Sequence, residues 1–124
     1  MKTFVILGAA MAAVAVAAGA FGAHALAARL TPERLATWET AARYHMYHSL
    51  ALVFVGLAAA RWQQAPLLTV AGWLFTAGIV IFGGTVYALA LGAPRWLGAV
   101  TPLGGLAFII GWIAFAAAVA RASA

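Results

Sequence analysis

The sequence predicts an all-α integral membrane protein, a four-helix bundle with a short interfacial amphipathic helix between its first and second helices. The first observation is composition: 67% of the 124 residues are hydrophobic and 7% are charged, with a mean hydropathy of +1.05. An average soluble domain is roughly 25% charged, so these few charges cannot cover a globule with a solvated surface. The second observation is that the charged residues separate long uncharged stretches.

Each uncharged stretch is long enough for one crossing of a bilayer core of about 30 Å, which takes roughly 20 apolar residues in a helix. A β-barrel is excluded because the runs of Ala, Leu, Val and Gly lack the alternation of a barrel strand. We therefore expect a single transmembrane domain over residues 1–124, with short connections and antiparallel neighbours. Its spans are expected at about 4–27, 44–61, 67–91 and 97–120.

The first span has a rival interpretation as a secretory signal peptide. Lys2 supplies a charged start, and Ala23-His24-Ala25 imitates a cleavage site with small flanking residues. The apolar stretch is longer than the usual signal core of about 7 to 15 residues. We therefore expect this segment to be retained as the first helix of the bundle.

Between the first and second spans, residues 32–43 are predicted to form the interfacial helix. Thr31-Pro32-Glu33 is typical of a helix start, because threonine caps free amides and proline is tolerated at the first helical position. One stripe at helical spacing consists of Leu35, Trp38, Ala42 and Met46. This helix is expected to turn, or to run on, into the second span. It is either a connector anchored by its tryptophan or a lid over a polar site.

Glycine and proline punctuate the third and fourth spans. Gly83-Gly84 in mid-helix and Thr101-Pro102 early in the fourth span interrupt regular hydrogen bonding, and each predicts a bend or a helix start. Small residues spaced four apart predict close helix contacts within a membrane. These seams are expected at Ala15, Gly19 and Ala23, at Gly84, Ala88 and Gly92, and at Ala107 and Gly111.

The scarce polar side chains gather towards one side of the predicted bundle. With four crossings, the connections before the second and fourth spans share one membrane side, and both termini lie on the other. The candidate binding residues on the first side are His24, Glu39, Arg43, Tyr44, His48, Arg95 and Thr101. Ionisable groups within a membrane are costly and are by default a functional hypothesis. The cluster predicts either a site for a small anion or lipid headgroup, or a hydrogen-bond network that holds the connector onto the bundle.

Other chemistries find little support. His45 and His48 are three residues apart without an intervening glutamate, so we expect no metal site and no cofactor. An enzyme is the least favoured class, because cysteine is absent and Ser49 is only a sequence neighbour of His48. The basic residues form no continuous stripe, which argues against nucleic-acid binding.

Several separate motifs resemble one family. They are Gly-Ala-Phe-Gly-Ala-His-Ala-Leu at 19–26, Trp-Glu-Thr-Ala at 38–41 with the run 43–48, Ala-Gly-Trp-Leu at 71–74, and Arg-Trp-Leu-Gly at 95–98 running into Thr-Pro-Leu-Gly-Gly at 101–105. The sequence resembles the small membrane proteins called domain of unknown function 423, which are similar to transmembrane protein 256. The resemblance implies several spans in an uncharacterised inner-membrane protein, and it implies no reaction, substrate or cofactor. Glutamine is usual in that family at the place of His45, so the resemblance does not mark this histidine as essential.

Two functions remain open. The first is a binding or transport module for a small anion, a lipid headgroup or a proton-linked solute, with Arg43 and Arg95 as charge partners and His24 and His48 as titrating donors. The second is an accessory or assembly subunit whose glycine seams dock against a larger membrane partner; a homo-oligomer is a possible assembly but would count against this second function. In both, the protein is a multi-pass protein of the cell inner membrane with the lipid bilayer as its partner. Three arginines in the connection after the first span favour a cytoplasmic histidine side.

Overall fold

The computed structural model describes residues 2–122, and every regular element in this part of the chain is a helix. The elements are α1 (Lys2–His24), the 3₁₀ turn η1 (Leu26–Ala28), α2 (Pro32–Arg61), α3 (Pro66–Gly78), the π-helical turn η2 (Ile79–Gly83), α4 (Gly84–Ala90), the 3₁₀ turn η3 (Arg95–Ala99) and α5 (Thr101–Arg121). Three continuous segments are long and apolar enough to cross a membrane: Lys2–Ala28, Pro66–Ala90 and Arg95–Arg121. They coincide with three of the four spans expected from the sequence.

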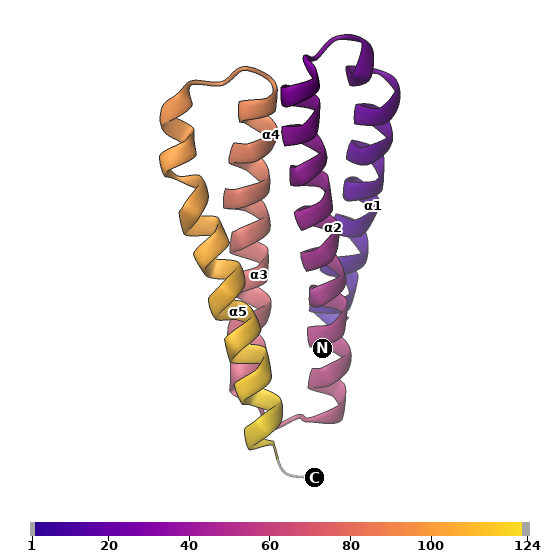
Figure 1. Ribbon diagram of the computed structural model, residues 1–124. Helices are drawn as coiled ribbons and strands as arrows, with labels where there is room; N and C mark the ends of the chain where they lie inside the picture. The colour runs from indigo at the N-terminus through magenta and orange to yellow at the C-terminus, as the bar shows by residue number, and fades with distance from the viewer. Residues whose placement is uncertain (1, 123–124) are drawn as a thin grey trace.

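The helices lie side by side as long rods (Figure 1). The α1–α2 and α4–α5 connections lie at one end of the molecule, which we call the η1 end, and the α2–α3 turn lies at the other, near both ends of the chain. Helix α2 packs against α1, α3, η2 and α4, whereas α5 packs mainly against α3 and η2. The helix with the most ionisable side chains is therefore the central one.

Residues 32–43 do not form a separate helix but the first part of α2. Thr31 caps it, since its Oγ1 accepts a hydrogen bond of 3.2 Å from the amide of Arg34, and Pro32 occupies the first turn. From there α2 runs on to Arg61 without a break at residue 43. The reason is local: no glycine or proline stands between Glu33 and Val55, so nothing stops helix propagation.

Trp38 lies inside the molecule rather than at its surface. It is 8% exposed, and its indole N–H donates a 2.8 Å hydrogen bond to the carbonyl of Ala18 in α1. Gly22 leaves room for the indole, because a Cβ there would lie 2.5 Å from its Cδ1 atom. The ring of Tyr87 packs on the indole with centroids 4.6 Å apart. Trp38 thus joins α1, α2 and α4 and is not the interfacial anchor that the sequence favoured.

Helix α3, the turn η2 and helix α4 form one continuous helical segment from Pro66 to Ala90. Over η2, just before Gly84, the backbone hydrogen bonds change from the α to the π pattern. Pro102 stands in the first turn of α5 and so begins that helix rather than bending it. Helices α5 and η2 approach closely at Gly104, where a Cβ would lie 2.4 Å from the backbone nitrogen of Phe82. The main core, between α1, α2, α3 and α5, includes Phe4, Leu52, Val55, Leu68 and Phe75, each fully buried.

Candidate functional site

The ionisable residues expected in one site include four that are exposed and come from three elements. His24 is exposed at the end of α1, Arg95 is exposed in η3, and Glu39 and Arg43 are exposed on α2. The hydrogen bond of Arg43 is local, because its Nη2 donates to Oγ1 of Thr40 at 3.3 Å. Within residues 2–122, no hydrogen bond joins these arginine, glutamate and histidine side chains to one another.

Thr101 belongs to a link between α4 and α5. Its Oγ1 lies 2.6 Å from Oγ1 of Thr85 and 3.2 Å from the carbonyl oxygen of Leu97. Thr85 in turn donates to the carbonyl oxygen of Ile81 at 2.7 Å, within the π-helical turn. The two hydroxyls thus satisfy backbone groups where the helical pattern is irregular, which is the usual way that such groups are accommodated within a membrane.

His48 lies halfway along α2. It follows Pro32 by 16 residues, which is about 24 Å at a rise of 1.5 Å per residue, so it is much deeper in the bundle than a helix starting at residue 44 would place it. The imidazole is 5% exposed. It stacks on the ring of Phe108 in α5, with centroids 3.5 Å apart and planes inclined by 9°.

Both nitrogens of His48 have partners. Nδ1 lies 2.7 Å from the carbonyl oxygen of Tyr44, which can only accept, so Nδ1 carries the hydrogen. The indole N–H of Trp112 can only donate and lies 3.1 Å from Nε2, so Nε2 carries the lone pair. His48 is therefore a neutral imidazole in one defined tautomer, and it ties α2 to α5.

His45 faces a different neighbour. Its Nδ1 lies 3.0 Å from the hydroxyl of Tyr87 in α4, and the ring also interacts with the backbone of Met11 in α1. The hydroxyl of Ser49 donates to the carbonyl oxygen of His45 at 2.7 Å. Among residues 2–122, every buried side-chain nitrogen and oxygen has a hydrogen-bond partner. The two histidines thus point to two different contacts and do not form a pair that shares a ligand.

The same part of the chain contains no group of three His, Cys, Asp or Glu side chains placed to hold a metal ion.

A groove lies between α2 and α5 beside His48. Its volume is about 780 Å³, and it is lined by Thr40, Tyr44, Tyr47, His48, Phe82, Gly105, Phe108, Ile109 and Trp112. Of the residues expected from the sequence, it therefore brings together Tyr44 and His48. Arg43 is not part of the lining, but it donates a hydrogen bond to Thr40, which lines the groove. The lining contains no charged side chain and is mostly apolar and aromatic.

Two hydroxyl groups in this groove are free. Tyr44 is 40% and Tyr47 is 52% exposed. Neither hydroxyl has a hydrogen-bond partner within residues 2–122. The other polar side chains of the groove, those of Thr40, His48 and Trp112, all have partners there. The sequence did not single out Tyr47, Phe82, Phe108 or Trp112. The available signal was weak, because an aromatic residue in an apolar helix is more often a packing residue than a ligand contact.

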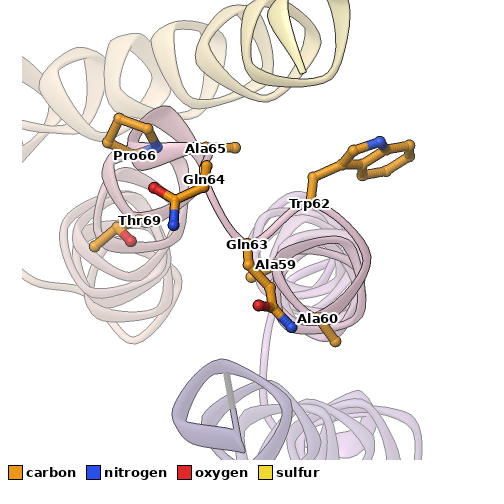
Figure 2. A pocket seen from close by; sticks show the side chains of 8 residues that line it. All are labelled: Ala59, Ala60, Trp62, Gln63, Gln64, Ala65, Pro66 and Thr69. Carbon is orange, nitrogen blue, oxygen red and sulfur yellow. The ribbon is translucent and has the colours of Figure 1, made fainter. Parts of the chain in front are cut away.

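A second hollow lies at the opposite end of the molecule, around the turn between α2 and α3. Figure 2 shows the side chains that line its volume of about 570 Å³, among them the carboxamides of Gln63 and Gln64 and the hydroxyl of Thr69. Both carboxamides are on exposed residues and lack a hydrogen bond to residues 2–122. This hollow is lined by no titratable side chain and by none of the candidate binding residues expected from the sequence.

Comparison with known proteins gives a consistent result. A family model with the description "Protein of unknown function (DUF423)" matches residues 18–105. The chain is 50% identical over 113 residues to the UPF0382 membrane protein YwdK of Bacillus subtilis, with 91% of this chain and 92% of that protein covered. It is 49% identical to the UPF0382 membrane protein SERP0230 of Staphylococcus epidermidis, with 91% of each chain covered. No solved structure matches the chain significantly.

Proposed function

The chain belongs to the DUF423 family of membrane proteins, and from that premise we propose that it binds a lipid-soluble, uncharged amphiphile in the groove between α2 and α5. The family resemblance of the sequence motifs is confirmed by the match, but the names of the relatives describe no activity. The geometry of the groove is therefore what points to a ligand. We place the protein in the cell inner membrane as a bundle of four crossings. Three are the apolar segments described above, and α2, second along the chain, is the additional one.

The burial of the polar groups of α2 supports its role as a crossing. At 30 residues it is about 45 Å long, more than the roughly 30 Å of a bilayer core. Its first turns, with Glu33 and Arg34, then extend to the headgroup level at the η1 end. Deeper along α2, His45, His48 and Ser49 face inward and are hydrogen-bonded, which is the arrangement that polar groups need in lipid. From residue 50 onward the large outward side chains are apolar, namely Leu50, Phe54 and Leu57, and the phenol of Tyr47 faces outward just before them.

The observation that carries the proposal is the composition of the groove. Its walls are apolar and aromatic, and it lies on the outside of the bundle, where Ile109 is 59% and Trp112 is 42% exposed. In a bilayer this face is open to lipid, so a ligand reaches it from the hydrocarbon. An anion inside the groove would lose its hydration without gaining a charged partner, so an uncharged ligand fits better than the anion that the sequence suggested. Arg43 marks the polar end of the groove through its bond to Thr40.

A substitution that fills the groove tests this proposal. Gly105 lines the groove, and a Cβ at this position would meet no atom within 4 Å. Gly105→Leu should therefore occupy the groove without disturbing the packing of α5. The matched control is Gly19→Leu, because Gly19 is equally unobstructed and lies on α1, away from the groove.

The measurement is photo-crosslinking of purified protein in nanodiscs with a diazirine-bearing alkyl probe, followed by peptide mapping. We expect the wild type and Gly19→Leu to be labelled at groove residues of α2 and α5, and Gly105→Leu to lose this labelling at least fivefold. Equal labelling of all three proteins, or labelling spread evenly around the bundle, would overturn the proposal.

A further inference from the structure

We infer that the ligand of this groove is an isoprenoid quinone, whose ring carbonyls accept hydrogen bonds from the hydroxyls of Tyr44 and Tyr47. This inference rests on the proposed function and names the chemical class of the ligand. It requires that the ligand be uncharged, carry hydrogen-bond acceptors, present a flat ring and dissolve in hydrocarbon. Each requirement comes from a separate feature of the groove.

The hydrogen-bonding groups of the groove select a ligand with acceptors. Both nitrogens of His48 are occupied, and the indole N–H of Trp112 is used on His48. Thr40 donates to the carbonyl oxygen of Ala36 and accepts from Arg43. The unused donors are the two phenolic hydroxyls. A plain hydrocarbon would leave both unpaired in an apolar medium, which is unfavourable, whereas a ring carbonyl pairs with them.

The aromatic walls select a flat ring. Tyr44 packs against Tyr47 and Phe82, with centroid distances of 5.7 and 5.2 Å, and the rings of His48 and Phe108 form a parallel stack beside them. Aromatic faces prefer other planar systems in offset or edge contacts, and they gain more from these than from a flexible acyl chain of equal area. A quinone ring is planar, and its methylated or fused edges are apolar.

The position of the groove along the bundle distinguishes a quinone from a phospholipid. On α5 the lining runs from Gly105 to Trp112, whereas the helix runs from Thr101 to Arg121. The lining thus extends from about 9 Å above the middle of α5 to about 2 Å below it, at 1.5 Å per residue. This is inside the roughly 15 Å half-thickness of the hydrocarbon core. Phospholipid ester carbonyls lie at the edge of that core, whereas a quinone ring dissolves within it.

The size of the groove agrees with such a ligand. Its volume of about 780 Å³ falls in the usual range of roughly 300 to 1,000 Å³ for small-molecule sites. That space takes the ring and the first isoprene units. The rest of the tail leaves along the exposed side chain of Ile109 and remains in the lipid, so the site does not have to enclose it.

The test compares the binding of a quinone with the binding of an alkyl chain that lacks the quinone ring. Wild-type protein in phosphatidylcholine nanodiscs is titrated with decylubiquinone, a ubiquinone analogue, and binding is followed by quenching of tryptophan fluorescence, with empty nanodiscs correcting for partition. The second probe is n-decane, which has the tail without the ring or any hydrogen-bond acceptor, and it is measured by displacement of the alkyl photoprobe. The variant is Tyr44→Phe with Tyr47→Phe, which removes both donors while keeping the rings. Circular dichroism checks that it folds, as expected for two exposed side chains.

We expect the double variant to bind decylubiquinone at least tenfold more weakly, since each lost hydrogen bond weakens binding several-fold, and to bind n-decane unchanged. Gly105→Leu should weaken both probes. If decylubiquinone bound the double variant as well as the wild type, or bound no better than n-decane, the quinone inference would be overturned while the groove proposal stood. If Gly105→Leu affected neither probe, the groove proposal itself would fail. A crosslinked dimer with a second copy seated against Tyr47 would overturn both.

Discussion

The glycines of α1 provide a quantitative test of the packing, because two of them should respond oppositely to the same substitution. Gly8 faces α2: a Cβ there would lie 2.7 Å from the carbonyl oxygen of Ser49 and 2.8 Å from the amide nitrogen of Val53. Both neighbours are main-chain atoms, so no rotamer change relieves the contact. A Cβ at Gly19 would meet no atom within 4 Å. Gly8→Ala and Gly19→Ala are therefore a matched pair on one helix.

The expected magnitudes follow from these distances. Ordinary contact begins at about 3.4 Å, so Gly8→Ala must push α1 and α2 apart by roughly 0.7 Å. Overpacking of this kind costs about 1 to 3 kcal/mol, partly offset by the better helix propensity of alanine, worth up to about 1 kcal/mol. Gly19→Ala gains the propensity without the clash. The free energies of unfolding of the two variants should thus differ by about 1 to 3 kcal/mol, a factor of roughly 5 to 150 in the unfolding constant.

The assay is SDS-induced unfolding from mixed micelles, followed by far-ultraviolet circular dichroism, with monodispersity checked for each variant. Gly8→Ala should unfold at a lower SDS fraction than the wild type, and Gly19→Ala at the same or a higher fraction. The spacing of small residues alone assigns the close contact to Gly19 and so predicts the reverse order. If Gly19→Ala were as destabilised as Gly8→Ala, the observed register of α1 on α2 would be refuted.

Three further predictions concern single hydrogen bonds. Trp38→Phe removes the donor to the carbonyl of Ala18 and also part of a buried ring, so thermal unfolding in detergent should show a loss of at least about 1 kcal/mol; an unchanged midpoint would contradict the bond. Thr85→Val removes the partner of Thr101, and a double-mutant cycle with Thr101→Val should give a coupling of about 0.6 kcal/mol, whereas strictly additive effects would argue against the link. Nitrogen NMR of labelled His48 should show a neutral imidazole with its proton on Nδ1, and a proton on Nε2 would exclude the observed donor.

Much of the fold could be predicted from composition and from the positions of charged residues, proline and glycine. The uncharged stretches predict long helices, and three of them coincide with segments capable of crossing a membrane. The Thr31-Pro32 start of α2 is confirmed as a cap and a first-turn proline. Gly83-Gly84 lies at the irregular turn η2, although the close contacts expected at Gly84 are absent, since a Cβ there would meet nothing within 4 Å. Helix caps, prolines and glycines act on residues next to them in the chain, so their effects can be predicted from the sequence.

Contacts between helices could not be predicted in the same way. The residues of α1 that pack inward are Phe4, Gly8, Ala15 and Gly22, mostly seven apart, and alanine is so frequent in this helix that stripes on other faces look equally good. The depth of His48 was missed for a related reason, since a boundary near residue 43 shortens α2 and moves the histidine towards its end. The partners of His48 and His45 are Trp112 and Tyr87, far away in sequence. Only the register between helices reveals them.

The structure also reverses which polar residues of α2 are free to act. The imidazole of His48 was the obvious chemical group in the sequence, yet its donor and its acceptor are both used in joining α2 to α5. A group so occupied can take a ligand only by giving up a contact that holds two helices together. The hydroxyls of Tyr44 and Tyr47 have no such commitment, and they lie beside His48 in the same groove. We therefore assign the ligand contact to the phenols and the positioning of the groove wall to the histidine, so Tyr44→Phe with Tyr47→Phe should weaken binding without loss of stability, whereas His48→Ala should lower both.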